Sequence, residues 1–192
     1  KAGNIAKCIT VCAEVNQKVV QTRHSQGWID EVFSDIDKLI KRVKIAKKNK
    51  EVVSIAFHGN IITIWKEFYK KNIFIDIGSD QTSLHNPWSG GYYPYGLDFE
   101  SANEMISNEP DLFKSKVKES LLIHAEYINK HCNKGTYFFD YGNAFLLETS
   151  KAGGDVFSKD GVNFKFPSYV QDIMGPMCFD YGFGPFRWVC AS

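Results

Sequence analysis

The chain has 192 residues, of which 44% are hydrophobic and 23% charged, a composition typical of one medium folded domain rather than of a disordered segment. The formal net charge of +1 gives no reason to expect nucleic acid or a membrane surface as a partner, and no apolar run approaches the roughly 18 residues of a membrane helix. Five scattered cysteines, in a chain long enough to bury a core without disulfides, favour a reducing, cytoplasmic compartment.

The first predicted elements are a short apolar strand at 9–13, a helical stretch to about Gln26, and a longer helix with Ser34 as its expected N-cap. The apolar residues of that longer helix recur at helical spacing on one face: Ile36, Leu39, Ile40 and Val43. Cys8 and Cys12 lie along the strand, where residues four apart are separated by about 13 Å. Two thiolates on one zinc ion lie within roughly 4 Å. We therefore expect no metal site.

Three later runs are rich in β-branched and aromatic residues and are predicted to be strands: VVSIAF (52–57), IFIDI (73–77) and TYFFDY (136–141). Helical segments at 61–72 and 99–133 lie between them, and Pro110 is expected to divide the second segment into two helices. Short apolar strands that alternate with helices indicate a parallel sheet covered on both faces. The fold class is α/β.

Polar side chains follow each predicted strand: Glu14, then His58 and Asn60, then Ser79 to His85, then Asp140 and Tyr141. In a parallel sheet these points share the carboxyl edge, where ligands of open α/β folds bind. Taken singly, the residues have structural explanations: N-caps for Asn60 and Asn143, a core histidine for His58, and a cap for Asp140. Their joint placement predicts a ligand cleft.

Glu14 indicates which ligand. An acidic side chain that ends a strand of a dinucleotide fold accepts hydrogen bonds from the ribose hydroxyls and repels a 2′-phosphate, which favours NAD over NADP. The glycine-rich loop that should precede it is absent, with only Gly3 upstream, so we expect the chain to be part of a longer protein. An NAD-dependent dehydrogenase domain and a non-catalytic truncated module are the alternatives that this reading leaves open.

Several long motifs resemble urocanase (urocanate hydratase) in the same order: AEVNQKVVQTRHSQGWIDE, IAFHGN, DQTSLHNPWSGGYYP, FDYGN and PSYVQDIMGPMCFDYGFGPFRWVC. The resemblance implies a Rossmann-like NAD-binding domain over 1–173, lacking its first strand and glycine loop. Residues 174–192 would return into the core, substrate-binding domain. The implied reaction adds water to urocanate to give imidazolonepropionate in histidine degradation, with tightly bound NAD+ as the electrophile.

The resemblance also implies roles for individual residues. Glu14 would hold the adenosine ribose and Arg187 the substrate carboxylate. Tyrosines would pack around the nicotinamide end: Tyr92, Tyr93 and Tyr141. The remaining cofactor contacts would be Asn60, Ile61, Gln81, Thr82, Ser83, Leu84 and His85.

The family's signature cysteine is expected outside this sequence, so no catalytic residue is assigned, and the piece alone is expected to be inactive. The intact enzyme would be a cytoplasmic homodimer.

Overall fold

The computed structural model describes residues 2–80, 86–141 and 144–183. Within these residues the strands are parallel and form two sheets, with β1, β3 and β2 in one and β4 and β5 in the other. The strands are β1 (Ile9–Glu14), β2 (Glu31–Phe33), β3 (Val53–His58), β4 (Ile77–Asp80) and β5 (Tyr137–Asp140). The α/β class and the parallel pairing are confirmed, although the described strands divide between two sheets instead of forming one.

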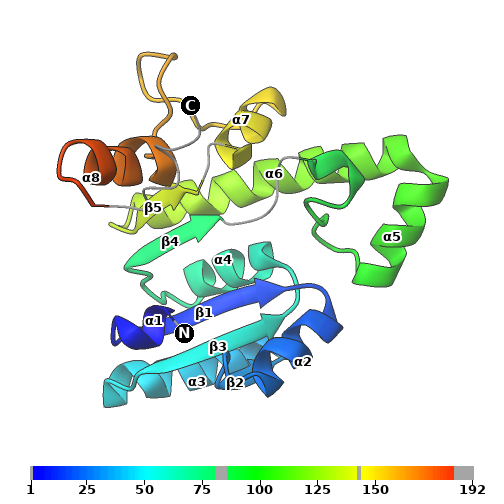
Figure 1. Cartoon of the computed structure of the whole chain (residues 1–192). Helices are drawn as coiled ribbons and strands as arrows, with labels where there is room; N and C mark the ends of the chain where they lie inside the picture. The colour runs from blue at the N-terminus through cyan, green and yellow to red at the C-terminus, as the bar shows by residue number, and fades with distance from the viewer. Residues whose placement is uncertain (1, 81–85, 142–143, 184–192) are drawn as a thin grey trace.

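The three-stranded sheet and the helices that cover it form the lower part of Figure 1. There β1 and β3 run side by side above α3. The helices of this half are α1 (Ala2–Ile5), α2 (Gln17–Ser25), α3 (Ile36–Asn49) and α4 (Ile61–Lys70). The apolar face of α3 packs on β3, with Leu39 and Ile55 fully buried in a shared core. Burial of this face stabilises a helix that is strongly basic on its other side.

The N-cap of α3 is Asp35 rather than the predicted Ser34. Asp35 has extended backbone angles, and its carboxylate accepts hydrogen bonds from the N–H groups of Asp37 and Lys38 at 2.9 and 3.0 Å. These contacts satisfy N–H groups that have no partner inside the helix. The same contacts hold the pKa of Asp35 below its usual value. The helix therefore begins one residue later than the sequence suggested.

The predicted strand at 73–77 is also displaced. Ile73 is buried in the core of the first sheet, while pairing with β5 begins at Ile77 and runs to Asp80. The apolar run IFIDI therefore serves mainly as a core-filling connection, and the strand lies at its far end. An apolar side chain fits either role, which is why the pattern placed the strand too early.

Long helices dominate the half that holds β4 and β5. They are α5 (Phe99–Asn108), α6 (Pro110–Cys132) and α7 (Ala144–Lys151), with a short 3₁₀ turn η1 (Pro87–Ser89) before them. Pro110 stands at the first turn of α6, which confirms the predicted division, because proline tolerates that position and lacks only an N–H that would have no partner. The buried face of α6 includes Phe113, Val117 and Leu121.

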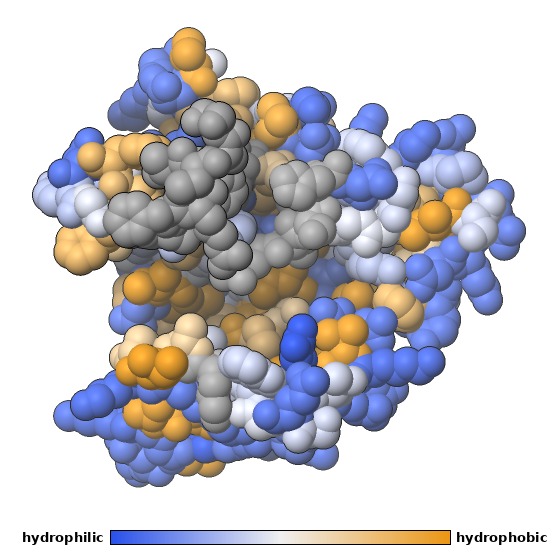
Figure 2. Space-filling view, in the orientation of Figure 1, coloured by the Kyte–Doolittle hydropathy of each residue, from blue (hydrophilic) through white to orange (hydrophobic). Residues whose placement is uncertain are grey.

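Helix α4 joins the two halves. Its Ile64 and Phe68 pack in the core of the three-stranded sheet, and Trp65 packs in the core formed by α6 and β5. Figure 2 shows that the surface is hollowed between the two halves, with hydrophobic residues visible in the hollow.

The described chain ends with a π-helical turn η2 (Tyr169–Met174) and α8 (Gly175–Phe179). Large side chains remain exposed here: Phe179, Tyr181 and Phe183.

Candidate functional site

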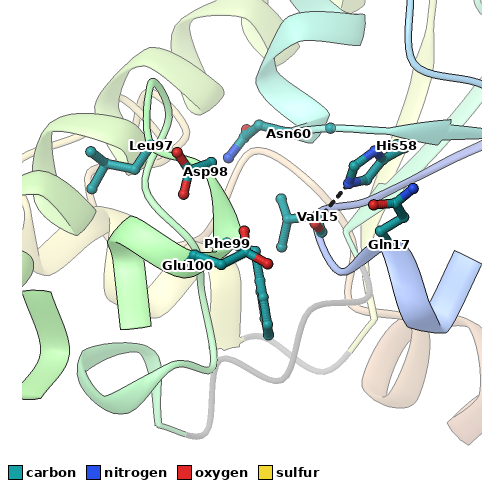
Figure 3. Close-up of a pocket in the computed structure, with 9 residues that line it drawn as sticks. Val15, Gln17, His58, Asn60, Leu97, Asp98, Phe99 and Glu100 are labelled. Carbon is teal, nitrogen blue, oxygen red and sulfur yellow. Dashed lines mark hydrogen bonds between the residues drawn. The ribbon is translucent and has the colours of Figure 1, made fainter. Parts of the chain in front are cut away.

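The carboxyl ends of β1 and β3 border a pocket of about 220 Å³ (Figure 3). Three segments form its wall: the residues after β1, the end of β3, and the start of α5. The lining residues are Val15, Gln17, His58, Gly59, Asn60, Leu97, Asp98, Phe99 and Glu100. His58 and Asn60 were predicted from the sequence to share this edge, whereas the contribution of α5 was not anticipated.

Glu14 and His58 are the last residues of β1 and β3 and face each other in the sheet register. The Glu14 carboxylate accepts a hydrogen bond of 2.8 Å from the N–H of Asn16, which places it at the turn into α2. Nε2 of His58 lies 3.2 Å from the carbonyl oxygen of Val15, as Figure 3 shows. Because a carbonyl can only accept, Nε2 carries the proton in this contact. His58 therefore holds the two strand ends together.

Asn60 caps a helix, which was one of the two roles predicted from the sequence, the other being a place in the ligand cleft. Its Oδ1 accepts a hydrogen bond of 2.9 Å from the N–H of Ile62 at the start of α4. Its Nδ2 donates one of 2.9 Å to the carbonyl of Tyr93. The side chain therefore caps a helix, lines the pocket and ties a distant loop to the end of β3. Ile61 follows it and packs against both cores.

Gly59 has no room for a side chain. A Cβ there would lie 2.5 Å from a ring carbon of Phe57. Its N–H donates a hydrogen bond of 3.0 Å to the carbonyl of Glu14, which continues the link between the two strand ends into the loop. The backbone thus turns tightly at the pocket wall.

Tyr93 lies partly buried beside the pocket. Its ring stacks on Phe99, with centroids 5.1 Å apart, and its hydroxyl donates a hydrogen bond of 3.0 Å to Asn103. Burial raises the pKa of Tyr93, so the phenol stays protonated near neutral pH. Together Tyr93 and Phe99 form an aromatic wall next to polar lining residues.

Tyr141 and Tyr92 belong to the other sheet edge. The side chain of Tyr141 is 52% exposed just after β5, and its ring stacks on Tyr169 with centroids 5.4 Å apart. Tyr92 is 2% exposed, and its hydroxyl lies 3.2 Å from Nδ1 of His124 inside the protein. Of these two predicted cofactor contacts, Tyr141 is accessible to a ligand and Tyr92 is enclosed by the core.

His124 is the buried residue that sequence reasoning missed. It lies in α6 at a position where the helical spacing from Leu121 to Ile128 predicts an apolar side chain. Burial lowers its pKa to about 3, so the ring is neutral near physiological pH. The sequence did contain a signal for His124, because a polar residue stands there at a core position of an amphipathic helix.

The remaining predicted site residues lie outside the described residues. They are Gln81, Thr82, Ser83, Leu84, His85, Asn143 and Arg187.

Asp140 is described. Its Oδ2 accepts a hydrogen bond of 3.0 Å from the N–H of Leu146, so the predicted capping interaction at the start of α7 is present.

The pocket suits the sugar and base of a nucleotide better than a phosphate. Glu100 supplies a carboxylate and Gln17 an amide, while the Asp98 carboxylate and the Asn60 amide line the pocket but are already bonded within the protein. Lysine and arginine are absent from the lining residues that the structure describes. Carboxylates accept hydrogen bonds from hydroxyl and amine groups and repel an anion. The ring of Phe99 adds an apolar surface.

Within the described ranges, no three His, Cys, Asp or Glu side chains are grouped to hold a metal ion. In the same ranges, no helix has the length and apolar character needed to cross a membrane.

Comparison with known proteins places this chain in a family. The family profile described as the urocanase Rossmann-like domain matches residues 1–173. The chain is 48% identical over 200 residues to the urocanate hydratase of Mus musculus and 46% identical over 199 residues to that of Homo sapiens. A probable urocanate hydratase of Caenorhabditis elegans is 45% identical over 196 residues. These alignments cover 100% of this chain but 29% of each relative. The chain belongs to the urocanase Rossmann-like domain family.

Proposed function

We propose that the protein containing this chain is a urocanate hydratase and that this chain supplies its NAD+-binding domain. The observation that carries the proposal is the match over the whole chain to proteins named urocanate hydratase, at up to 48% identity. The geometry adds support, because Glu14, His58 and Asn60 lie at one carboxyl edge of a parallel sheet, where dinucleotides bind.

The pocket beside Glu14 would hold the adenosine part of the cofactor. The carboxylate of Glu14 would accept hydrogen bonds from the ribose hydroxyls, and the ring of Phe99 would cover the base. Asn60 would act by fixing the loop that carries Tyr93, since both of its amide groups bond within the protein. NAD+ would supply the electrophile of the reaction when bound.

The catalytic end would lie toward the second sheet. Tyr141 is exposed at its carboxyl edge, where an aromatic face can fix the orientation of a flat ring. Arg187 would bind the carboxylate of urocanate, a task that suits a planar bidentate donor. The residues 81–85 would complete the dinucleotide contacts.

Residues 1–173 would form the cofactor domain, and 174–192 would lead into the substrate domain of a cytoplasmic homodimer. Because the chain covers 29% of its relatives, we expect no turnover from these 192 residues alone.

The test is an absorbance assay on the full-length protein that contains this chain. We expect the ultraviolet absorbance of urocanate to fall while the absorbance of NADH stays at zero, since hydration leaves the cofactor oxidised at the end of each cycle. Formation of NADH during turnover would instead support a dehydrogenase. Absence of both signals in a folded, NAD+-loaded protein would favour a non-catalytic module.

A further inference from the structure

Three buried polar side chains meet beneath the carboxyl end of β4. Asp80 is the last residue of β4, His124 lies in the middle of α6, and Tyr92 precedes α5. Their exposed fractions are 5%, 0% and 2%, respectively. We call Asp80, Tyr92 and His124 the buried cluster. Residues far apart in the sequence thus bring a carboxylate, a phenol and an imidazole into the interior.

Nδ1 of His124 faces both of the other side chains. It lies at hydrogen-bond distance, 3.2 Å, from the hydroxyl of Tyr92, and at the longer distance of 4.0 Å from Oδ2 of Asp80. The rest of its surroundings is apolar and aromatic, with the ring of Phe145 at a centroid distance of 4.7 Å. The polar contacts of His124 are therefore concentrated on the side that faces Asp80.

Placing a histidine here carries a cost. Its Nε2 is buried and has no hydrogen-bond partner among the described residues. A buried polar atom without a partner destabilises the folded state, and an apolar side chain of similar volume would avoid that loss. The neighbouring core positions of α6 do carry apolar residues, such as Val117 and Leu121. A purely structural role at position 124 is therefore better filled by leucine.

The buried cluster is connected to the sheet edge that carries Tyr141. Asp80 is paired with Asp140 in the register of β4 and β5, and its carbonyl accepts a hydrogen bond of 3.3 Å from the N–H of Tyr141. Asp80 also immediately precedes Gln81 in the sequence. The backbone of Asp80 thus links the buried cluster to Tyr141.

We propose that His124 and Tyr92 are positioning residues for the dinucleotide: hydrogen-bonded to each other and packed against the Asp80 side chain, they fix the carboxyl edge of β4 and β5 against the ligand. The inference rests on the proposed NAD+-binding function. It gives Tyr92 a role inside the protein, in place of the direct nicotinamide contact that the family resemblance implied. Both side chains are buried, so neither would contact the cofactor directly.

Two variants of the full-length protein test the proposal. His124→Leu replaces the imidazole with an apolar side chain that suits the core, and Tyr92→Phe removes one oxygen atom. We measure the dissociation constant for NAD+ by isothermal titration after bound nucleotide is removed, together with the thermal midpoint. We expect both variants to bind NAD+ roughly tenfold more weakly, while His124→Leu keeps or raises the thermal midpoint.

His131→Leu is the matched control. His131 is a second buried histidine of α6, seven residues further on, and its Nε2 lies 2.8 Å from the carbonyl of Trp65. It stands near the amino end of β5, because the N–H of Thr136 bonds to its carbonyl. This variant should lower the thermal midpoint, since it removes a buried hydrogen bond to the carbonyl of Trp65, and should leave the affinity for NAD+ unchanged.

Unchanged affinity in His124→Leu or in Tyr92→Phe would overturn the inference, as would equal weakening in His131→Leu. If His124→Leu does not fold, Tyr92→Phe decides the question. A wild-type protein that binds no NAD+ would overturn the proposed function itself. A wild-type protein that binds NAD+ with variants of equal affinity would overturn this inference alone.

Discussion

The side chains that end β1 and β3 lie at the proposed ligand edge and also form hydrogen bonds that fix the local backbone. Glu14, next to the lining residue Val15, accepts a hydrogen bond from Asn16, and His58 of the pocket wall donates one to Val15, so both side chains fix the backbone there. A ligand that binds at such an edge meets side chains whose positions are already set, and less conformational entropy is lost on binding. The pocket wall is preorganised by its own hydrogen bonds.

Glu14→Gln tests the ribose contact. The amide oxygen can still accept the hydrogen bond from Asn16, so the fold should be kept, while the charge that strengthens a hydrogen bond to a ribose hydroxyl is lost. We expect roughly tenfold weaker binding of NAD+ and a smaller preference over NADP+, because a neutral amide repels a 2′-phosphate less. Titration calorimetry with both nucleotides measures this.

The control for Glu14 is Glu67→Gln, which removes a carboxylate from α4, where it pairs with Lys70 at the surface. Its affinity for either nucleotide should match that of the wild type. An unaltered ratio of NAD+ to NADP+ affinity in Glu14→Gln would contradict the assignment.

Helix ends carry much of the organisation of this domain. The start of α4 is capped by Asn60, that of α5 by Asp98 and that of α3 by Asp35. The caps at α4 and α5 also line the pocket, so the helices begin at the edge where the ligand is proposed to bind. The same side chains therefore serve the stability of the helices and the shape of the pocket.

Asn60→Ala removes the cap of α4 and the hydrogen bond to the carbonyl of Tyr93. We expect the free energy of unfolding to fall by about 1–3 kcal/mol, from the lost cap and the lost loop contact. Asn60→Asp keeps a cap acceptor but cannot donate to the carbonyl, so its loss should be intermediate in size. Urea denaturation of the three proteins measures the order, and equal stability of Asn60→Ala and wild type would refute it.

The sequence was informative about elements and less so about their ends. Pro110 marked the division between α5 and α6, and the helical face of α3 was read from its periodicity. The strand at 73–77 was placed too early because Ile73 fills a core without pairing, a distinction that local pattern does not contain. The N-cap of α3 was displaced by one residue because serine and aspartate both suit that position.

For the candidate site, the sequence predicted the shared edge of Glu14, His58 and Asn60, since parallel strands bring their carboxyl ends together. It did not predict the contribution of Phe99 or the enclosure of Tyr92. Both depend on how α5 and α6 pack across the sheet edges, and that packing involves residues far apart in the chain.

The two halves of the molecule share one helix instead of meeting at a flexible joint. Ile64 of α4 is buried in the core of the three-stranded sheet, and Trp65, the next residue, is buried against Phe138 and His131 of the other half. Unfolding either core would expose one face of α4 and remove support from the other. The halves should therefore unfold as one cooperative unit.

Ile64→Ala and Phe138→Ala test this coupling from opposite sides. Each should lower the free energy of unfolding by about 2–5 kcal/mol, because a buried cavity replaces the lost side chain. In both variants, circular dichroism and tryptophan fluorescence should report a single coincident transition. Two separated transitions, with only one moved by each substitution, would show that the halves unfold independently.

The aromatic side chains that follow η2 have a practical consequence for anyone who prepares this chain. Phe179, Tyr181 and Phe183 are 79%, 74% and 65% exposed and lie within five residues of one another. Rings left in water at that density adhere to any apolar surface they meet, including the same patch on a neighbouring copy. Light scattering from the purified chain should thus rise with concentration, and work in dilute solution, or with a mild detergent, would keep the copies apart.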